Sequence, residues 1–206
     1  MVTSKLSGLS PGNAFIKRSF DIGLSLLGLL ATVWVIIIAW VLSTLETRRN
    51  GFFSQSRVGR HGRLFRVIKI RTMRDTPGID TTVTASGDPR ITPLGRFFRK
   101  TKIDELPQLF NVLLGQMSFV GPRPDVPGFA DCLDEGDNII LLVRPGITGP
   151  ATLKYRDEEV LLARQEDPDA YNREVLFPDK VRVNKAYIEN YSFRRDLYYI
   201  WKTIVG

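Results

Sequence analysis

The chain has 206 residues, a formal net charge of +7, one cysteine and one histidine. A single cysteine excludes an internal disulfide, and a zinc site built on His and Cys ligands is excluded as well. The charge is unevenly placed, since residues 48–102 carry 14 Lys/Arg against 3 Asp/Glu, whereas residues 103–179 carry 6 against 15. The basic segment should attract phosphates or an anionic membrane surface, and the acidic segment should be an ordinary solvated surface.

The N-terminal quarter of the chain predicts a tail followed by a membrane helix. Residues 1–13 are polar and contain Gly and Pro, which predicts a flexible tail. Residues 14–50 should hold a membrane-embedded helix, because the 24 residues from Ile22 to Leu45 carry no charge. At about 1.5 Å per residue this helix is long enough for a hydrocarbon core of roughly 30 Å. The stretch is too long for a signal peptide, and helices of soluble cores rarely run so far without a charge.

Positive charge flanks both ends of this apolar stretch. The flanking cations are Lys17, Arg18, Arg48 and Arg49. A single span usually shows a positive bias only at its cytoplasmic end, so cations at both ends favour a re-entrant helix whose two ends stay cytoplasmic. The alternative is a straight span with its N-terminus outside the cell. Re-entry needs a break in the middle, and the candidates are Gly28 and Thr32, whose hydroxyl can bond a carbonyl one turn back.

The next segment predicts a β-hairpin. Residues 52–73 form two strand-like runs separated by GRHGR, whose glycines suit a turn. Lys69 and Arg71 lie on the same face of the second strand, because strand side chains alternate. They suit phosphate binding, although cations are also common on a solvated strand edge.

Helices and loops are expected in the rest of the chain. Residues 75–89 predict a loop. Residues 93–102 predict a basic amphipathic helix that lies either on the bilayer surface or with its apolar side in the core. Residues 128–142 look helical and acidic, and residues 157–171 predict a charged helix without assigned chemistry. Residues 181–205 predict one helix or a helix pair, whose aromatic residues suit either a membrane interface or a core.

One stretch, residues 95–127, combines a basic run, an acid pair, a short apolar helix and a Gly-Pro-Arg-Pro turn. The apolar positions have helical spacing and are Leu106, Leu109, Phe110, Leu113 and Leu114. Pro107 is tolerated only in a first turn, so the helix should begin at about Asp104. The helix N-terminus would then keep Asp104 ionised, as a carboxylate nucleophile requires. The ordinary alternative is that Asp104 caps the helix and Glu105 is a first-turn acid.

Fixed cations surround this acid pair in the sequence. They are Arg96, Arg99, Lys100, Lys102 and, between two prolines, Arg123. Carboxylates among cations suit a site for phosphate and a divalent metal ion.

The segment TKIDELPQLFNVLLGQMSFVGPRPDVP, residues 101–127, resembles the signature of the bacterial sugar transferases, the monotopic phosphoglycosyl transferases that start glycan assembly on a polyprenyl phosphate. The resemblance continues in KIRTM, DPRITPLGRFFRKT, VRPGITGPA and YIENYSFRRDLYYIWKT, and it covers nearly the whole chain in family order. Two positions depart from the family pattern: Ala31-Thr32 replaces a usual Ser-Pro, and Gln116 replaces a common Asp.

The resemblance implies an α+β fold: a re-entrant N-terminal membrane helix, a small β-hairpin, and interfacial amphipathic helices around a cytosolic active site. Residues 51–206 would be the catalytic domain on the membrane surface. The reaction implied is transfer of a sugar-1-phosphate from a UDP-sugar to undecaprenyl phosphate, with release of UMP and with Mg²⁺ as cofactor. It would occur at the cytoplasmic face of the bacterial inner membrane, through a covalent aspartyl-phosphosugar intermediate.

The resemblance also implies the residue roles. Asp104 would be the nucleophile and Glu105 its assisting base or metal partner, with both carboxylates facing Mg²⁺. The expected substrate-binding cations are Lys69, Arg71, Arg123 and Arg144. Arg144 would reach a phosphate or the uracil, and its alternative is an ion pair with the acidic segment.

Further partners follow from the same reading. We expect the protein to bind anionic phospholipid and not nucleic acid. The sequence does not identify the sugar or fix the oligomeric state, and a homodimer is one of the possibilities. The rival of another class is a non-enzymatic membrane adaptor whose basic hairpin binds anionic lipid or nucleic acid. Among enzymes, the rivals are a lipid-linked phosphatase and a different nucleotide-sugar transferase.

Overall fold

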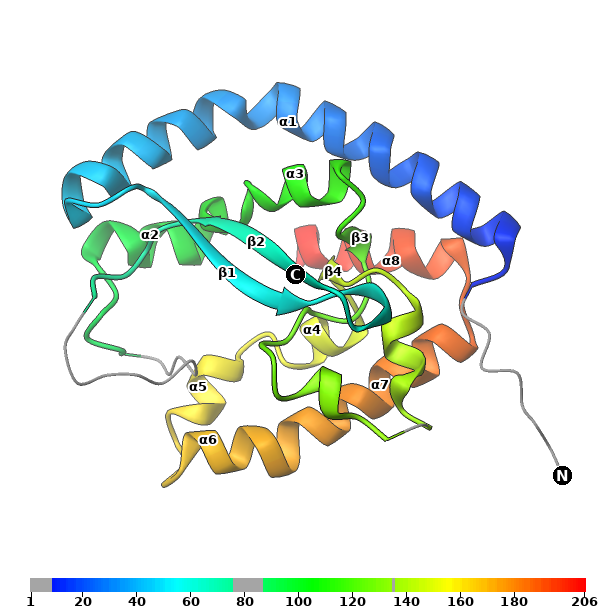
Figure 1. Ribbon diagram of the computed structural model, residues 1–206. Helices are drawn as coiled ribbons and strands as arrows, with labels where there is room; N and C mark the ends of the chain where they lie inside the picture. The colour runs from blue at the N-terminus through cyan, green and yellow to red at the C-terminus, as the bar shows by residue number, and fades with distance from the viewer. Residues whose placement is uncertain (1–8, 76–86, 135) are drawn as a thin grey trace, which may run out of the picture.

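The structure is a computed structural model that describes residues 9–75, 87–134 and 136–206. A long helix, α1, arches over a body of two small sheets and short helices (Figure 1). The elements of the first half are α1 (Pro11–Thr47), β1 (Phe52–Val58), β2 (Leu64–Ile70), α2 (Pro93–Thr101), α3 (Gln108–Leu113) and β3 (Ser118–Val120). Those of the second half are β4 (Gly146–Thr148), α4 (Pro150–Lys154), α5 (Glu158–Leu162), α6 (Pro168–Tyr171), α7 (Phe177–Glu189) and α8 (Phe193–Val205). This confirms a mixed architecture of helices and strands.

Helix α1 is continuous and bowed. Ser10 caps its start by accepting a hydrogen bond from the backbone N–H of Asn13 at 3.4 Å, and Arg48 ends it in a left-handed conformation with φ 54°. The predicted hydrogen bond from the Thr32 hydroxyl to the carbonyl of Gly28 is present at 2.7 Å. Such back-bonding bends helices without breaking them. The expected hydrogen bond is therefore present, but the interruption expected there is absent from this helix. Residues 1–8 of the predicted tail lie outside the described residues.

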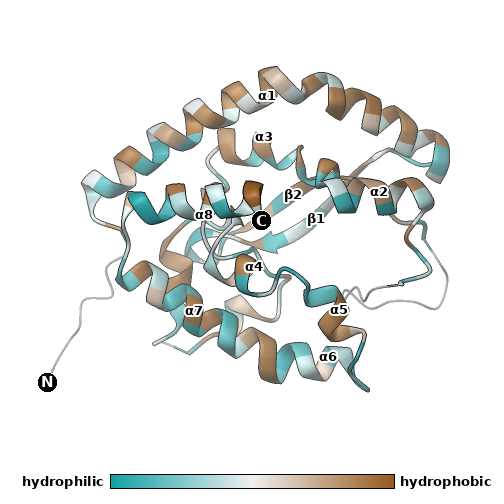
Figure 2. Ribbon diagram, turned by 180° about the vertical axis from the view of Figure 1, so that it is seen from behind, coloured by the Kyte–Doolittle hydropathy of each residue, from teal (hydrophilic) through white to brown (hydrophobic). Residues whose placement is uncertain are grey.

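The middle of α1 is apolar on nearly every side (Figure 2). Trp34 is 71% exposed and Leu30 is 67% exposed, while Leu29, Ile36 and Ala39 are buried against the body. Within the described part of the chain, α1 is the one helix whose length and composition would allow it to cross a membrane. Soluble surfaces rarely leave an apolar face of this extent uncovered, so α1 is suited to a bilayer.

Both ends of α1 are hydrogen-bonded to the same body. Near its start, Lys17 pairs with Asp196 of α8 at 2.6 Å, and Arg18 donates to the carbonyls of Val112 and Leu113 at 2.7 and 2.8 Å. Asp21 then accepts from the hydroxyl of Ser118 and the N–H of Phe119 in β3, at 3.1 and 3.0 Å.

The other end of α1 is held in the same way. The Ser43 hydroxyl donates to the carbonyl of Arg71 at 2.6 Å, and Glu46 accepts from the N–H of Leu94 at 3.1 Å. The helix is thus fixed at two separated points on one globular unit.

The predicted hairpin is confirmed. Strands β1 and β2 pair antiparallel with Phe52 opposite Ile70 and Val58 opposite Leu64. In the turn that joins these two strands, His61 has a left-handed backbone conformation with φ 58°. The second sheet is a short parallel pair of β3 and β4.

Helix α3 differs from the prediction. It covers only Gln108–Leu113 and follows a separate 3-10 turn at Ile103–Glu105. Phe110 and Leu114 of the predicted stripe are 40% and 69% exposed, whereas the polar Asn111 is buried. The reason is that the Asn111 amide bonds the backbone of β2, accepting from the N–H of Ile68 at 3.1 Å and donating to the carbonyl of Arg66 at 2.8 Å. These bonds turn the polar face of α3 toward the hairpin.

The predicted amphipathic helix is confirmed as α2, with Phe98 buried and Phe97 53% exposed. In contrast, the described part of residues 128–142, which omits residue 135, contains 3-10 turns at Ala130–Cys132 and Asn138–Leu142 and no α-helix. The single helix expected at 157–171 is two short helices, α5 and α6. Residues 76–86 of the predicted loop lie outside the described residues.

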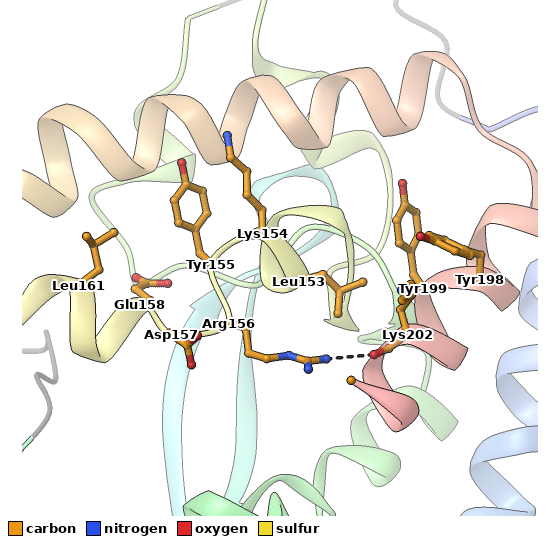
Figure 3. A pocket seen from close by; sticks show the side chains of 11 residues that line it. Leu153, Lys154, Tyr155, Arg156, Asp157, Glu158, Leu161, Tyr198, Tyr199 and Lys202 are labelled. Carbon is orange, nitrogen blue, oxygen red and sulfur yellow. Dashed lines mark hydrogen bonds between the residues drawn. The ribbon is translucent and has the colours of Figure 1, made fainter.

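The C-terminal helix pair is confirmed as α7 and α8, and its aromatic residues are divided between the core and the surface. Tyr187 is buried in a core with Val181 and Ile188, while Tyr198 and Trp201 are 52% and 53% exposed. Between α8 and the segment connecting α4 to α5 lies a cavity of about 590 Å³ (Figure 3).

Candidate active site

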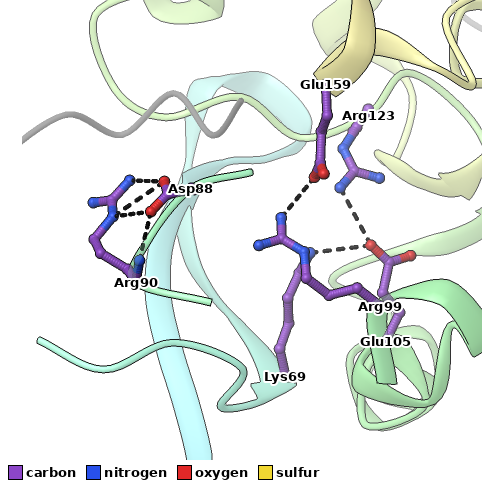
Figure 4. Close-up of polar contacts among 7 residues, drawn as sticks. All are labelled: Lys69, Asp88, Arg90, Arg99, Glu105, Arg123 and Glu159. Atoms are coloured by element: carbon purple, nitrogen blue, oxygen red, sulfur yellow. Dashed lines mark hydrogen bonds and ion pairs between the residues drawn. The ribbon is translucent and has the colours of Figure 1, made fainter. Parts of the chain in front are cut away.

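Lys69, Glu105 and Arg123 meet at one point from three different elements (Figure 4). The Oε1 atom of Glu105 lies 3.1 Å from Nζ of Lys69 on β2 and 3.2 Å from Nη2 of Arg123. Arg123 stands between Pro122 and Pro124, whose fixed φ angles keep its backbone rigid. The structure thus brings together three of the residues that the sequence proposes for the site.

Asp104 is held in a short turn rather than at the start of a helix. Lys102 ends α2 in a left-handed conformation with φ 59°, and the 3-10 turn of Ile103–Glu105 follows directly. The α3 helix begins after Pro107, so neither the helix cap nor the helix dipole expected at Asp104 is present. Asp104 is only 7% exposed, and its buried Oδ1 has no hydrogen-bond partner among the described residues.

This environment shifts the pKa of Asp104 in the opposite direction from the one expected. Burial, reinforced by the adjacent charge of Glu105, raises the pKa of Asp104 to about 6, although Lys69, Lys102 and Arg99 act to lower it. The expectation that the local structure would favour the ionised form was therefore wrong in direction. A pKa of about 6 still leaves this carboxylate mostly ionised at pH 7.

Glu105 has the opposite electrostatics. Burial alone would raise its pKa, but the charges of Lys69, Arg123 and Lys102 outweigh burial and hold the pKa of Glu105 well below its usual range. Glu105 in turn raises the pKa of Arg123. The pKa of Lys69 is lowered because burial disfavours its charge more than Glu105 favours it. Glu105 is thus a permanent anion that organises two cations beside Asp104.

A second group of charges surrounds this site and was not identified from the sequence. Arg99 contacts Glu159 at 2.6 Å (Figure 4), and Lys180 contacts Glu158 at 2.6 Å. Burial raises the pKa of Asp125 to about 6, against the charges of Lys180, Arg57 and Arg123. The sequence signal available was the acid pair Glu158-Glu159, but only tertiary folding brings α5 toward α2.

Two of the predicted substrate-binding cations are used elsewhere. Arg71 donates to the carbonyl of Asn50 at 2.9 Å and lies 3.9 Å from Asp75. Arg144 donates to the carbonyl of Gly115 at 2.8 Å, at the far end of α3 from Glu105. The structure therefore does not bring Arg71 or Arg144 into contact with the acid pair. Among the described residues, Arg144 also forms no ion pair with the acidic segment, which was its alternative.

Gln116, one of the departures from the family pattern, also lies at the far end of α3. Its Oε1 accepts a hydrogen bond from the Asn111 amide at 2.7 Å. This contact extends the hydrogen-bond network that joins α3 to β2. Gln116 in place of the common Asp therefore affects the packing of α3 and does not contact the carboxylates of Asp104 and Glu105.

The site offers few carboxylates that could hold Mg²⁺. Within the described residues no group of three or more His, Cys, Asp and Glu side chains is arranged to hold a metal ion. However, Mg²⁺ bound with phosphate substrates is often held by only one or two protein carboxylates. The buried, unpartnered Oδ1 of Asp104 beside Glu105 fits this smaller requirement.

A pair of adjacent carboxylates among cations, in a body that carries an exposed apolar helix, is an arrangement suited to phosphate groups at a membrane surface. The family described as bacterial sugar transferase matches residues 12–206, so the chain belongs to the bacterial sugar transferase family.

Three relatives of known name show which bacterial sugar transferases the chain is similar to. The exopolysaccharide production protein ExoY of Sinorhizobium fredii is 29% identical, over 98% of this chain and 90% of its own length. The undecaprenyl-phosphate glucose phosphotransferase of Komagataeibacter xylinus is 37% identical over 95% of this chain. The undecaprenyl-phosphate galactose phosphotransferase of Salmonella typhimurium is 33% identical over 92% of this chain. The match spans only 36% and 40% of the length of these two phosphotransferases.

Proposed function

We propose that this chain transfers a sugar-1-phosphate from a UDP-sugar to undecaprenyl phosphate and releases UMP. Its family and the relatives named as phosphotransferases make it a transferase of phosphosugar groups. The observation that carries the finer proposal is the buried, unpartnered Oδ1 of Asp104 next to the Lys69–Glu105–Arg123 cluster. Family membership removes the non-enzymatic adaptor as a rival.

Asp104 is the nucleophile in this proposal. Its carboxylate oxygen attacks the β-phosphorus of the donor, the bond from that phosphorus to the bridging oxygen breaks, and UMP leaves with the bridging oxygen. A phosphate oxygen of undecaprenyl phosphate then attacks the same phosphorus and displaces the Asp104 carboxylate, which yields the lipid diphosphate sugar. A carboxylate with a pKa near 6 is ionised at neutral pH yet little stabilised by hydrogen bonds, which suits a nucleophile.

Lys69 and Arg123 supply the charge stabilisation that phosphoryl transfer needs. Phosphoryl transfer depends mainly on positioning and on fixed positive charge. Because Glu105 holds both cations on one oxygen atom, they are in place before the substrate binds. Their spare N–H groups can donate to the non-bridging oxygens of the diphosphate. In this assignment Glu105 positions cations, and its low pKa makes it a poor general base.

Mg²⁺ is the proposed cofactor. Asp104 and Glu105 are the residues that would hold it, together with phosphate oxygens of the substrate. Bound there, the ion would neutralise charge on the diphosphate.

We also propose that α1, although it is continuous, enters the membrane as a bowed helix without crossing it, and leaves the active site on the cytoplasmic face of the bacterial inner membrane. The support is the pair of anchor points described above: Lys17 and Asp21 near one end of α1, and Ser43 and Glu46 near the other, all bond to one body. A straight span would place these two ends on opposite sides of a core roughly 30 Å thick. Arg48 and Arg49, which are exposed where α1 ends, suit anionic phospholipid, which we propose as a further partner.

The test is a panel of UDP-sugars incubated with the protein, undecaprenyl phosphate and Mg²⁺, with UMP as the measured product. UMP release that needs the lipid phosphate for turnover supports the proposal. UDP as the product would indicate a conventional glycosyltransferase, and inorganic phosphate would indicate a phosphatase. In parallel, Asp104→Asn should abolish turnover and the trapped covalent adduct, and an active Asp104→Asn variant would contradict the assigned nucleophile.

A further inference from the structure

The cavity between α8 and the α4–α5 connection combines three kinds of side chain (Figure 3). Tyr198 and Tyr199 contribute aromatic rings, Arg156 and Lys202 contribute cations, and Asp157 contributes a carboxylate. Arg156 reaches across from the connection and donates to the backbone carbonyl of Lys202 at 3.0 Å. The volume of about 590 Å³ lies in the range of small-molecule sites.

One wall of this cavity also belongs to the surroundings of the acid pair. Glu158 lines the cavity and is paired with Lys180 at 2.6 Å, while its neighbour Glu159 holds Arg99 at 2.6 Å. Arg99 is one of the cations whose charge acts on Asp104. Helix α5 thus borders the cavity through Glu158 and contacts a cation near the acid pair through Glu159. The charge of Glu158 also acts on Arg123, so the cavity and the cations of the active site are neighbours.

We propose that this cavity binds the nucleoside part of the nucleotide-sugar donor, an inference that rests on the proposed function. The diphosphate then lies at Lys69 and Arg123, and the uracil ring packs against the tyrosines. Stacking on aromatic side chains is a general way to bind a base. The ribose hydroxyls have an acceptor in the Asp157 carboxylate, as in other nucleotide sites where an acidic residue binds the ribose.

The two cations distinguish this ligand from the other parts of the substrates. A polyprenyl chain would place hydrocarbon against the exposed Arg156, and hydrocarbon offers no acceptor for its remaining N–H groups. UMP, in contrast, leaves the reaction with a full phosphate charge that these cations can hold. The cavity is therefore a retention site for the leaving nucleotide as well as a binding site for the donor.

The test is UMP binding by the full chain in lipid nanodiscs, measured by calorimetry on an Asp104→Asn background so that the result does not depend on turnover. Arg156→Gln should weaken UMP binding at least tenfold. Leu161→Trp, which fills the cavity from α5, should weaken it similarly without removing a charge. Lys185→Gln is the matched control. Lys185 lies on α7, pairs with Asp137 and is not among the residues that line the cavity.

Photolabelling gives an independent measurement. A 5-azido analogue of UMP should label peptides from the 153–161 and 198–202 segments in competition with unlabelled UMP. Unchanged UMP affinity in both cavity variants would overturn the proposal, as would weakened glucose 1-phosphate binding with intact UMP binding. Failure of the proposed function is a separate result, since it would be seen as no UMP release from any donor by the wild-type chain.

Discussion

Asp104 and Glu105 are neighbours in the chain, yet their carboxyl groups are in opposite electrostatic states. Burial raises the pKa of Asp104 to about 6, whereas the cations around Glu105 outweigh its burial and hold its pKa well below the usual range. The difference arises because Glu105 faces Lys69 and Arg123 directly, while Oδ1 of Asp104 is buried without a partner among the described residues. Separated pKa values in adjacent carboxylates are typical of sites that assign them different roles.

The ionisation of Asp104 should set the acid limit of the reaction. Formation of the covalent adduct in a single turnover should be nearly constant above pH 7 and should fall about tenfold per pH unit well below pH 6. Circular dichroism over the same range is the control for unfolding. A midpoint near pH 4 would show that the nucleophile is a carboxyl group with an ordinary pKa.

The same raised pKa predicts a stability gain in Asp104→Asn. A carboxyl whose pKa is higher in the folded state than in the unfolded state stabilises the fold below the unfolded value of about 3.8, and this contribution is lost as pH rises through about 6. Removing the charge should therefore raise the free energy of unfolding at pH 8 by about 2–3 kcal/mol. The gain should vanish at pH 3.5. Thermal unfolding with EDTA present measures both, and an equal effect at both pH values would contradict the explanation.

Glu105→Gln should slow transfer and also weaken the fold. It leaves Lys69, whose side chain is 21% exposed, without a charged partner. The expected loss is on the order of 2–3 kcal/mol, below the value for fully buried pairs. Adding Lys69→Met should recover part of the stability but none of the activity. A double-mutant cycle measures this coupling. Additive stability effects would mean that the two side chains do not interact.

The two anchor points of α1 predict its topology. In a Cys132→Ser background, which removes the exposed native thiol, cysteines are introduced by Gly12→Cys and by Arg49→Cys. Both should react with an impermeant maleimide in inside-out vesicles, and neither should react in intact spheroplasts. Reaction of the Gly12→Cys variant in spheroplasts would establish a straight span.

Arg123 and Arg144 should respond differently to the same substitution. Arg123→Gln removes a cation that lies 3.2 Å from Glu105, and the KM for the donor should rise about tenfold or more. Arg144→Gln removes a hydrogen bond to the carbonyl of Gly115, so it should lower the melting temperature and leave the KM within about twofold. A large rise in KM for Arg144→Gln would restore the substrate-binding role predicted from the sequence.

Local sequence signals predicted the elements that depend on local chemistry. The turn glycines predicted the β1–β2 hairpin, and Thr92 with Pro93 gives α2 the capped start that its amphipathic pattern requires. The pattern failed at Phe110 and Leu114, which are exposed. Apolar periodicity identifies a core only if the surroundings are water, and beside a membrane helix an outward apolar residue has a second favourable environment.

The candidate site was predictable only in part, because some of its residues are far apart in the sequence. The cations that precede Asp104 in the chain, with Lys69 and Arg123, could be recognised from the motif. Glu158 and Glu159 approach the site only because α5 folds back toward α2, and Glu159 contacts Arg99 across 60 positions of sequence. The short turn that buries Asp104 depends on the left-handed Lys102, a conformation that sequence patterns do not reveal for a lysine.

The last turn of α1 also completes the first turn of α2, because Glu46 accepts a hydrogen bond from the N–H of Leu94 at 3.1 Å. Helix α2 carries Arg99, whose charge acts on Asp104. With α1 in the bilayer as proposed, a change in bilayer thickness that tilts α1 would pull on the helix next to Asp104, and the lipid surroundings would be mechanically coupled to the proposed chemistry.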